Sequence, residues 1–504
     1  ISNGPCRSSD DVVISFPVVA STPADFTSAP PVVCQGSTGN IYSVPAVAGI
    51  IYTWSYTGTG HTIHGTGNAV SIDFGPAATG GTLSVTATNN CGTSQPRSID
   101  ISIPSAGFRY NGSPFCQNDP DPLPILDQGS MAGTFSSSSG LVFLNTSTGQ
   151  IDLSASSSGT FIVTNTVSTA VCGTLTATAS VTISGLTWSG AASTDWNTPG
   201  NWSCGYVPYP ATHVVIPNVT RKPVLNTGIS GTVNNLTIEA GSSLVITGGT
   251  LQVSGTITNN GTFDASAGTV ELAGTAPQTI GAGIFSGNTV QNLNVNNASG
   301  VTLAGALNVT GIVKVIAGSL ASNGFLTLVS TNTGTALIDG SGAGQVTGNV
   351  TMQRYLSPAY GYKYISSPFL AATVAELDDD RTIDPWFATV YRYDENNIVH
   401  GQPASGWVEY ETPSGILSPL SGYSVNFGDQ AAAKTIDISG VVNNGNLSVT
   451  LYNHDQPYTT GFNLVGNPYP SPVNWSEPSG WIKTNLDNSL YFFRASSTDP
   501  YEGT

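Results

Sequence analysis

GLTWSGAASTDWNTPGNWSCGYVPYPATHVVIPN, residues 185–218, separates two parts of the chain that differ in composition. It contains Trp188, Trp196 and Trp202, together with one cysteine and four prolines. Upstream lie segments framed by cysteines, and downstream lies a long run of Gly, Thr, Asn and β-branched residues with little charge. We predict that this stretch is an aromatic cap at the beginning of a β-solenoid, whose coils bury alternate strand residues.

The run after the cap supports a solenoid. From about residue 219 to 350, pairs of apolar residues with one residue between them recur between Gly and Asn turns. This alternation is typical of strands with one buried face, and Gly and Asn tolerate the left-handed corners between them. Residues 233–255 align with residues 290–311, a spacing of about 57 residues. We therefore expect the cap and solenoid to form one domain over 185–350.

The six cysteines form a second pattern, and they lie at Cys6, Cys34, Cys91, Cys116, Cys172 and Cys204. The sequence VCQG at 33–36 resembles FCQN at 115–118, and NNCGTS at 89–94 resembles AVCGTL at 170–175. Such repetition predicts two copies of one Ig-like β-sandwich. We expect the copies to span 17–104 and 105–184.

Each copy is expected to be closed by its own disulfide, Cys34–Cys91 in the first and Cys116–Cys172 in the second. Residues 1–16 match the last strand of such a copy, so we expect the chain to be a segment of a longer protein. Cys6 and Cys204 are then predicted to be unpaired within this chain. Disulfides indicate an oxidising, extracytoplasmic compartment.

The last part of the chain, residues 351–504, gains aromatic and charged residues. Its segments GYKYISSPF (361–369) and GFNLVGNPY (461–469) share one pattern at an offset of 100 residues. Each is expected to be a strand that ends in a proline turn. We predict a C-terminal β-sandwich in which the two segments pair, so the fold class is all-β throughout.

This last part also contains the densest acidic segment, ELDDDRTIDPW at 376–386. Its carboxylates are hard oxygen donors that could hold Ca²⁺, and the candidate ligands are Asp378, Asp379, Asp380 and Asp384. An acidic loop exposed to solvent is the favoured alternative. We expect no other cofactor.

Five aromatic residues of the same part are candidates for a platform on which sugar rings stack, because flat rings match the C–H faces of sugars. They are Tyr391, Tyr393, Trp407, Tyr410 and Tyr423. Packing of these rings in the core is the favoured alternative.

Composition excludes several classes of function. A formal net charge of −17 with only 13 Lys and Arg argues against nucleic-acid binding. No apolar run approaches the roughly 20 residues of a membrane helix, so membrane insertion is not expected. The sequence lacks a nucleophile elbow, a P-loop and a zinc-protease motif. We therefore expect no catalytic residues and no enzyme. Glu239 and Asp264 are the best acids for a polysaccharide-degrading solenoid.

The cap motif T-W-S-G-x-x-S-T-D-W-N-x-x-x-N-W, followed by V-P and V-V-I-P, resembles the start of repeat regions in large surface proteins of Bacteroidota. The repeat at 17–104 resembles the PKD-like modules of those proteins. The segment GFNLVGNPYPSPVNW (461–475) resembles a module that lies upstream of their C-terminal sorting domain. The resemblance implies export by the type IX secretion system, whose machinery would be a transient partner.

Together these features predict an extracellular, adhesin-like structural protein of the cell surface that forms a stalk or filament by self-association. A carbohydrate-binding surface protein, with polysaccharide as its partner, is the alternative from a different class. A solenoid enzyme that degrades polysaccharide is the second alternative.

Overall fold

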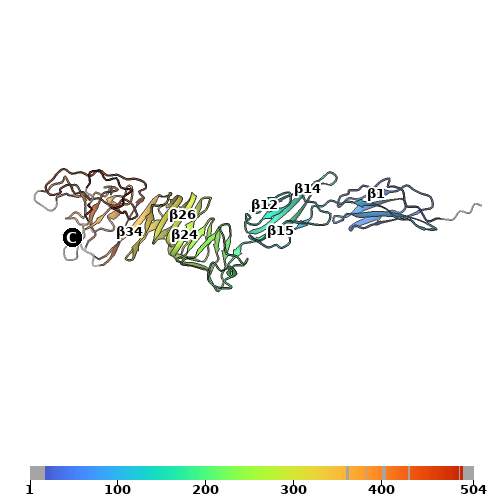
Figure 1. Cartoon of the computed structure of the whole chain (residues 1–504), viewed down its shortest axis with the longest axis horizontal. Coiled ribbons are helices and arrows are strands. Elements are labelled where there is room, and N and C mark those ends of the chain that lie inside the picture. The colour runs from blue at the N-terminus through green and yellow to red at the C-terminus, as the bar shows by residue number, and fades with distance from the viewer. Residues whose placement is uncertain are drawn as a thin grey trace, which may run out of the picture. The chain divides into compact units, whose positions relative to one another are not determined.

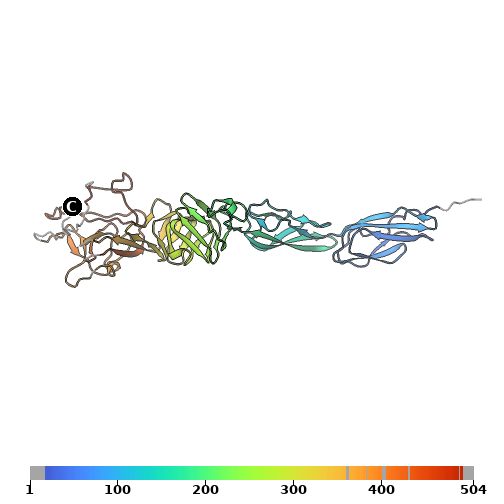
Figure 2. The same cartoon turned by 90° about the horizontal axis from the view of Figure 1, so that it is seen from below.

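The computed structural model describes residues 18–358, 362–381, 383–399, 405–428, 432–486 and 489–491 (Figures 1 and 2). Over these residues the chain consists of β-strands joined by turns, with three short 3-10 helices and no α-helix. It divides into two compact units, residues 1–184 and residues 185–504. The predicted all-β fold class is confirmed.

The first repeat is a β-sandwich. Its strands are β1 (Asn40–Ser43), β2 (Ile51–Tyr56), β3 (His61–His64), β4 (Ala69–Phe74), β5 (Gly81–Asn89), β6 (Gly92–Thr93) and β7 (Arg97–Ile101). One sheet has the order β1–β4–β3, and in the other sheet β2, β6 and β7 all pair with β5. Alternate residues such as Ile72, Phe74 and Leu83 point inward and are buried, which is the period-2 pattern of the sequence.

The second repeat has its own core and a longer hairpin. Its strands are β8 (Phe108–Arg109), β9 (Phe115–Cys116), β10 (Ile125–Leu126), β11 (Thr134–Ser137), β12 (Val142–Asn145), β13 (Gln150–Asp152), β14 (Gly159–Thr169) and β15 (Gly173–Ser184). The main sheet has the order β11–β14–β15–β9. Phe135, Ile151, Val163 and Val181 fill the core.

The predicted disulfide pairing is wrong. Cys34 is bonded to Cys172, so the bridge joins the two repeats across 138 residues, with a Cα–Cα distance of 5.5 Å. Cys91 is a free, exposed thiol. Cys116 and Cys204 are both disulfide-bonded, which also corrects the prediction that Cys204 is unpaired.

Strand geometry explains why neither repeat closes its own bridge. Val33, beside Cys34, bonds to Ser102 just past the end of β7, while Cys91 lies in the turn at the opposite end of β5. The nine residues of β5 therefore separate the two cysteines by roughly 27 Å, at about 3.4 Å per residue. A disulfide requires Cα atoms within about 7 Å. The second repeat has the same arrangement along β15, and Cys6 lies outside the described residues.

The second unit begins with the predicted solenoid, which is confirmed (Figure 1). Its early strands are β16 (Leu186–Thr187), β17 (Val214–Ile216), β18 (Val224–Asn226), β19 (Ser230–Val233), β20 (Leu236–Ile238), β21 (Ser243–Thr247), β22 (Thr250–Val253), β23 (Ile257–Asn259) and β24 (Thr262–Leu272). The later strands are β25 (Gln278–Ile280), β26 (Thr289–Leu303), β27 (Leu307–Val309), β28 (Ile312–Ala321), β29 (Leu326–Leu328), β30 (Ser330–Thr331), β31 (Gly334–Thr335), β32 (Leu337–Asp339) and β33 (Gln345–Thr347). The 3-10 helices η1 (Pro199–Asn201) and η2 (Ser286–Asn288) interrupt them.

The strands stack in parallel columns, and equivalent inward residues lie directly above one another. Val233 pairs in register with Val253, Val253 with Leu272, and Leu272 with Val295. All four side chains are buried. One coil thus takes about 20 residues, because each column returns after that interval.

The 57-residue alignment does not correspond to a coil. Val290 is the counterpart of Val233 in that alignment, but it stacks on Ala265 and Val309 in a different column. Strands on different sides of a coil, such as β20 and β22, share the same apolar–polar–apolar alternation. Sequence similarity therefore relates one side to another as readily as one coil to the next.

The three tryptophans cover the beginning of the solenoid core. Trp188 and Trp196 are fully buried, and each packs edge-to-face on Trp202 with ring centroids 4.9 Å apart. Asn201, also fully buried, accepts hydrogen bonds from the backbone N–H groups of Ala192 and Ser193 and donates to the carbonyl of Asp195. The D-W-N-x-x-x-N-W motif thus closes the core with its rings and fixes the loop with its second asparagine.

No strand boundary separates the solenoid from the C-terminal module. Strand β34 (Asn349–Leu356) stacks in parallel on β29 and pairs antiparallel with β39 (Lys434–Val441). The boundary expected at 350/351 therefore falls inside a strand, and one hydrophobic core runs from the cap into the module. The module adds η3 (Val374–Leu377) and a sheet of order β35 (Tyr362–Ile365), β38 (Tyr423–Asn426), β36 (Val390–Tyr393) and β37 (Trp407–Glu409).

Candidate functional site

One face of the sheet β35–β38–β36–β37 is lined with aromatic rings. Antiparallel register places Tyr364 beside Ser424, Ser424 beside Tyr391, and Tyr393 beside Trp407. Side chains two residues apart share a face, so five rings project from this side of the sheet. We call this surface the aromatic face, and it consists of Tyr362, Tyr364, Tyr391, Tyr393 and Trp407.

Edge-to-face contacts hold these rings in place. Tyr393 meets Trp407 with centroids 5.1 Å apart and Tyr362 meets Tyr391 at 5.8 Å, while Tyr364 lies 5.8 Å from Trp407 at a tilted angle. Tyr364 is 41% exposed, and the other four rings are partly exposed. Burial and the neighbouring Tyr362 raise the pKa of Tyr391 to about 12, so its hydroxyl stays neutral at ordinary pH.

Polar groups accompany the rings on the same side. Glu409 is opposite Tyr391, and Asn426 is opposite Tyr362. Glu409 is exposed, and Asn426 is partly exposed. A carboxylate, an amide and phenol hydroxyls can exchange hydrogen bonds with sugar hydroxyls, while ring faces accept sugar C–H groups. The arrangement suits a neutral polyhydroxylated ligand.

The predicted sugar-stacking set is thus divided between the two faces. Tyr391, Tyr393 and Trp407 lie on the aromatic face, but Tyr423 is 3% exposed and packs in the core, stacked on Tyr410. The hydroxyls of Tyr410 and Tyr423 both donate to the carbonyl of Ile416. Sequence reasoning missed Tyr362 and Tyr364, although their alternation in Y-K-Y was the signal.

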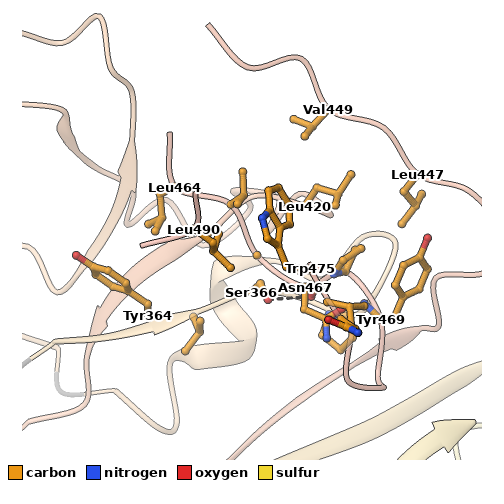
Figure 3. Close-up of a pocket in the computed structure, with 18 of the residues that line it drawn as sticks. Tyr364, Ser366, Leu420, Leu447, Val449, Leu464, Asn467, Tyr469, Trp475 and Leu490 are labelled. Carbon is orange, nitrogen blue, oxygen red and sulfur yellow. Dashed lines mark hydrogen bonds between the residues drawn. The ribbon is translucent and has the colours of Figure 1, made fainter. Parts of the chain in front are cut away.

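A groove of about 2080 Å³ adjoins this sheet, and Tyr362 and Tyr364 are among its lining residues. Figure 3 shows the groove with Tyr364 labelled. Its apolar lining includes Leu420, Leu447, Val449, Leu464 and Leu490. Trp475 and Trp481 also line it, but Lys483 places its ammonium 3.9 Å from the Trp475 ring centroid and 5.7 Å from that of Trp481. The chain's own cation therefore covers one face of the Trp475 ring.

The two duplicated segments meet beside this groove. Ser366 Oγ donates a 2.8 Å hydrogen bond to the carbonyl of Asn467, which Figure 3 shows as a dashed line. Gly466, the residue equivalent to Ser366 in the duplication, approaches so closely that a Cβ there would lie 2.1 Å from that of Ser366. The two segments are neighbours, but the prediction that they form two paired strands is wrong. The first segment contains β35, which pairs with β38, while 461–469 has only a single bridge, from Val465 to Ser421. Only glycine fits at position 466.

The aspartates of the acidic segment 376–386 form ion pairs with basic side chains of the chain and hydrogen bonds with its backbone. Asp378 forms a 2.7 Å ion pair with the buried Arg381, and Asp380 lies 3.7 Å from Lys434. Asp384 instead accepts hydrogen bonds from the backbone N–H groups of Trp386 and Phe387.

No group of three or more His, Cys, Asp or Glu side chains that could hold a metal occurs among the described residues, which include Asp379. The four aspartates therefore do not converge on the predicted Ca²⁺ position.

The two acids considered for an enzyme have ordinary surroundings. Asp264 accepts hydrogen bonds from the backbone and hydroxyl of Ser266, and Glu239 is exposed in the turn after β20. A catalytic solenoid stays a prediction without a structural observation in its favour. Within the described ranges, no helix is long and apolar enough to span a membrane.

Comparison with known families gave two matches. A PKD-like domain model matches residues 19–101, which agrees with the expected repeat. A model described as "Domain of unknown function (DUF8693)" matches residues 187–269 and 266–502. A search of curated proteins gave no match. Because the second model covers more than half of the sequence, from the aromatic cap through the C-terminal module, the chain belongs to the DUF8693 family.

Proposed function

We propose that the chain is an extracellular structural and adhesive protein of the cell surface, exported by a type IX pathway and built to bear tension. The disulfide Cys34–Cys172 carries this proposal. Its connectivity makes a covalent link from the first repeat directly to the second. Tension between the ends of the chain then passes through this disulfide bond, which bypasses the polypeptide between Cys34 and Cys172.

The solenoid suits the same role. Its core is continuous and apolar, and its inward side chains stack in register from coil to coil. Tension along the chain would have to separate parallel backbone ladders whose inward residues are buried. Single-molecule pulling before and after reduction tests the load-bearing role, and surface labelling of intact producing cells tests the location.

Carbohydrate binding by the aromatic face is the second candidate, and the row of partly exposed rings with flanking polar groups favours it. We expect Trp407→Ala to weaken retention on a polysaccharide that wild type binds by about tenfold. The indole supplies the largest stacking surface, and tenfold equals about 1.4 kcal/mol. Affinity electrophoresis through gels containing α- or β-glucans, xylan, chitosan or pectin measures this shift.

Trp386→Ala is the matched control, because Trp386 is 85% exposed and lies outside the sheet. Equal losses for the two variants would mean that exposed aromatic residues bind without specificity. Retention of wild type that Trp407→Ala leaves unchanged would remove the aromatic face from the binding site.

A further inference from the structure

Cys91 and Cys172 occupy equivalent positions in the two repeats. Each lies in the tight turn after the penultimate long strand, directly before a glycine with positive φ, Gly92 or Gly173. In each turn the cysteine N–H donates a 2.9 Å hydrogen bond to a side-chain oxygen. The acceptor is Asn89 Oδ1 in the first repeat and Thr169 Oγ1 in the second.

The cysteines of the other class are also equivalent. The carbonyl of Cys34 accepts a hydrogen bond from the N–H three residues later, and so does the carbonyl of Cys116. Cys34 bonds to the hairpin cysteine of the following repeat, Cys172. Cys116 is also bonded, and its partner is not the Cys172 of its own repeat. The bond Cys34–Cys172 thus joins the first cysteine of one repeat to the hairpin cysteine of the next repeat.

Exposed apolar side chains surround Cys91, as they would at a surface that packs against another domain. Val18 is 74% exposed, and its carbonyl accepts a hydrogen bond from the side-chain amide of Asn89. Val19 lies against Gly92. Ile51, 70% exposed, is opposite Thr88 at the same end of β5. Three exposed aliphatic side chains therefore surround an exposed thiol whose counterpart in the second repeat is bonded.

We propose that Cys91 forms a disulfide with another PKD-like repeat, which presents a cysteine equivalent to Cys34 and docks on this hairpin end. We assign that partner to the repeat that precedes the first one along the polypeptide, because Cys34 itself bonds to the repeat that follows it. A second copy of this chain does not provide the partner, since its Cys34 and Cys116 are already bonded. This linkage stands whether or not the bridges bear load.

Formation of the bond is an oxidation that needs a disulfide oxidant. The two thiols lose two electrons and two protons, and a protein or small-molecule disulfide is reduced to two thiols in exchange. Cys91 attacks the mixed disulfide between the partner cysteine and that oxidant, and the oxidant leaves as a thiolate. Exposure of Cys91 provides the access that this exchange requires.

The test uses the native protein from producing cells, with free thiols blocked at lysis and the digest mapped without reduction. We expect the Cys91 peptide to be joined to a peptide from a preceding PKD-like repeat, with Cys34–Cys172 intact. A blocked Cys91 thiol would overturn the proposal. A bond from Cys91 to Cys6, to a second Cys91, to a small thiol or to another polypeptide would overturn it equally.

Cys91→Ser provides a second measurement. In that variant we expect one newly blocked thiol in the preceding repeat, while the Cys34–Cys172 peptide pair is unchanged and shows that the first two repeats still fold. No new thiol in the variant would overturn the proposal even if the wild-type map were incomplete.

Discussion

Single molecules pulled from their two ends will gain roughly 450–500 Å of contour length after reduction, and this length will be absent from the oxidised chain. The expectation follows from the 138 residues between Cys34 and Cys172, at about 3.3–3.6 Å for each extended residue. Unfolding of either repeat cannot lengthen the oxidised molecule by the residues inside the loop. The measurement is force spectroscopy of the full chain with and without a reductant.

Two variants separate the bridge from other effects of reduction. Cys172→Ser should lengthen the oxidised chain without any reductant, but by less than full reduction does, because the bridge of Cys116 stays closed. Cys91→Ser should behave like wild type when residues 1–504 are pulled, because Cys91 is free in this structure. If oxidised wild type released the full length, Cys34 and Cys172 would not be bonded in the protein under load, and the load-bearing role would fail.

The same bridge should also stabilise the two repeats against unfolding without load. In the chain-entropy model, closing a loop of 138 residues stabilises by about 5 kcal/mol. A hydrogen-bonded sandwich resists tension only until its ladder opens, while a covalent bridge remains closed. The bridge between the repeats therefore limits how far the chain can extend under tension, which the hydrogen bonds of the individual sandwiches cannot do.

The cysteines show what sequence could and could not predict. Their spacing correctly indicated two copies of one repeat, but it wrongly suggested a bridge within each copy. Equal spacing records equivalent positions, not proximity, and the nine-residue strand β5 separates Cys34 from Cys91. Assigning Cys34 to the end of the last strand and Cys91 to the preceding hairpin would have shown that the two cysteines lie too far apart to bond.

The solenoid was predictable to the level of single buried residues. The apolar pairs of the sequence include Leu236 with Ile238 and Leu251 with Val253, and all four side chains are buried. Column assignment was not predictable, because strands on different sides of a coil share the same alternation. The aromatic face was predictable only in part, since which side of a strand meets the core depends on distant neighbours such as Ile436.

The second large effect concerns the aromatic cap. Trp202→Ala should lower the free energy of local opening at the start of the solenoid by about 3–5 kcal/mol, which is typical of truncating a buried tryptophan. Trp202 packs on both other rings, and its Nε1 donates to the carbonyl of Trp196. Hydrogen exchange of the full chain measures the change as a faster exchange of amides in β16, β17 and β20.

Trp196→Phe is the matched control, because the buried Nε1 of Trp196 has no hydrogen-bond partner. Replacing this indole by a phenyl ring removes an unpaired donor, so its loss of packing is partly offset. Trp188→Phe should cost more, since it leaves the carbonyl of Arg221 without its 2.7 Å bond. If Trp202→Ala left exchange in β16, β17 and β20 unchanged, those strands would not depend on the rings to close their core, and the tryptophan spacing would need a different explanation, such as binding to a partner.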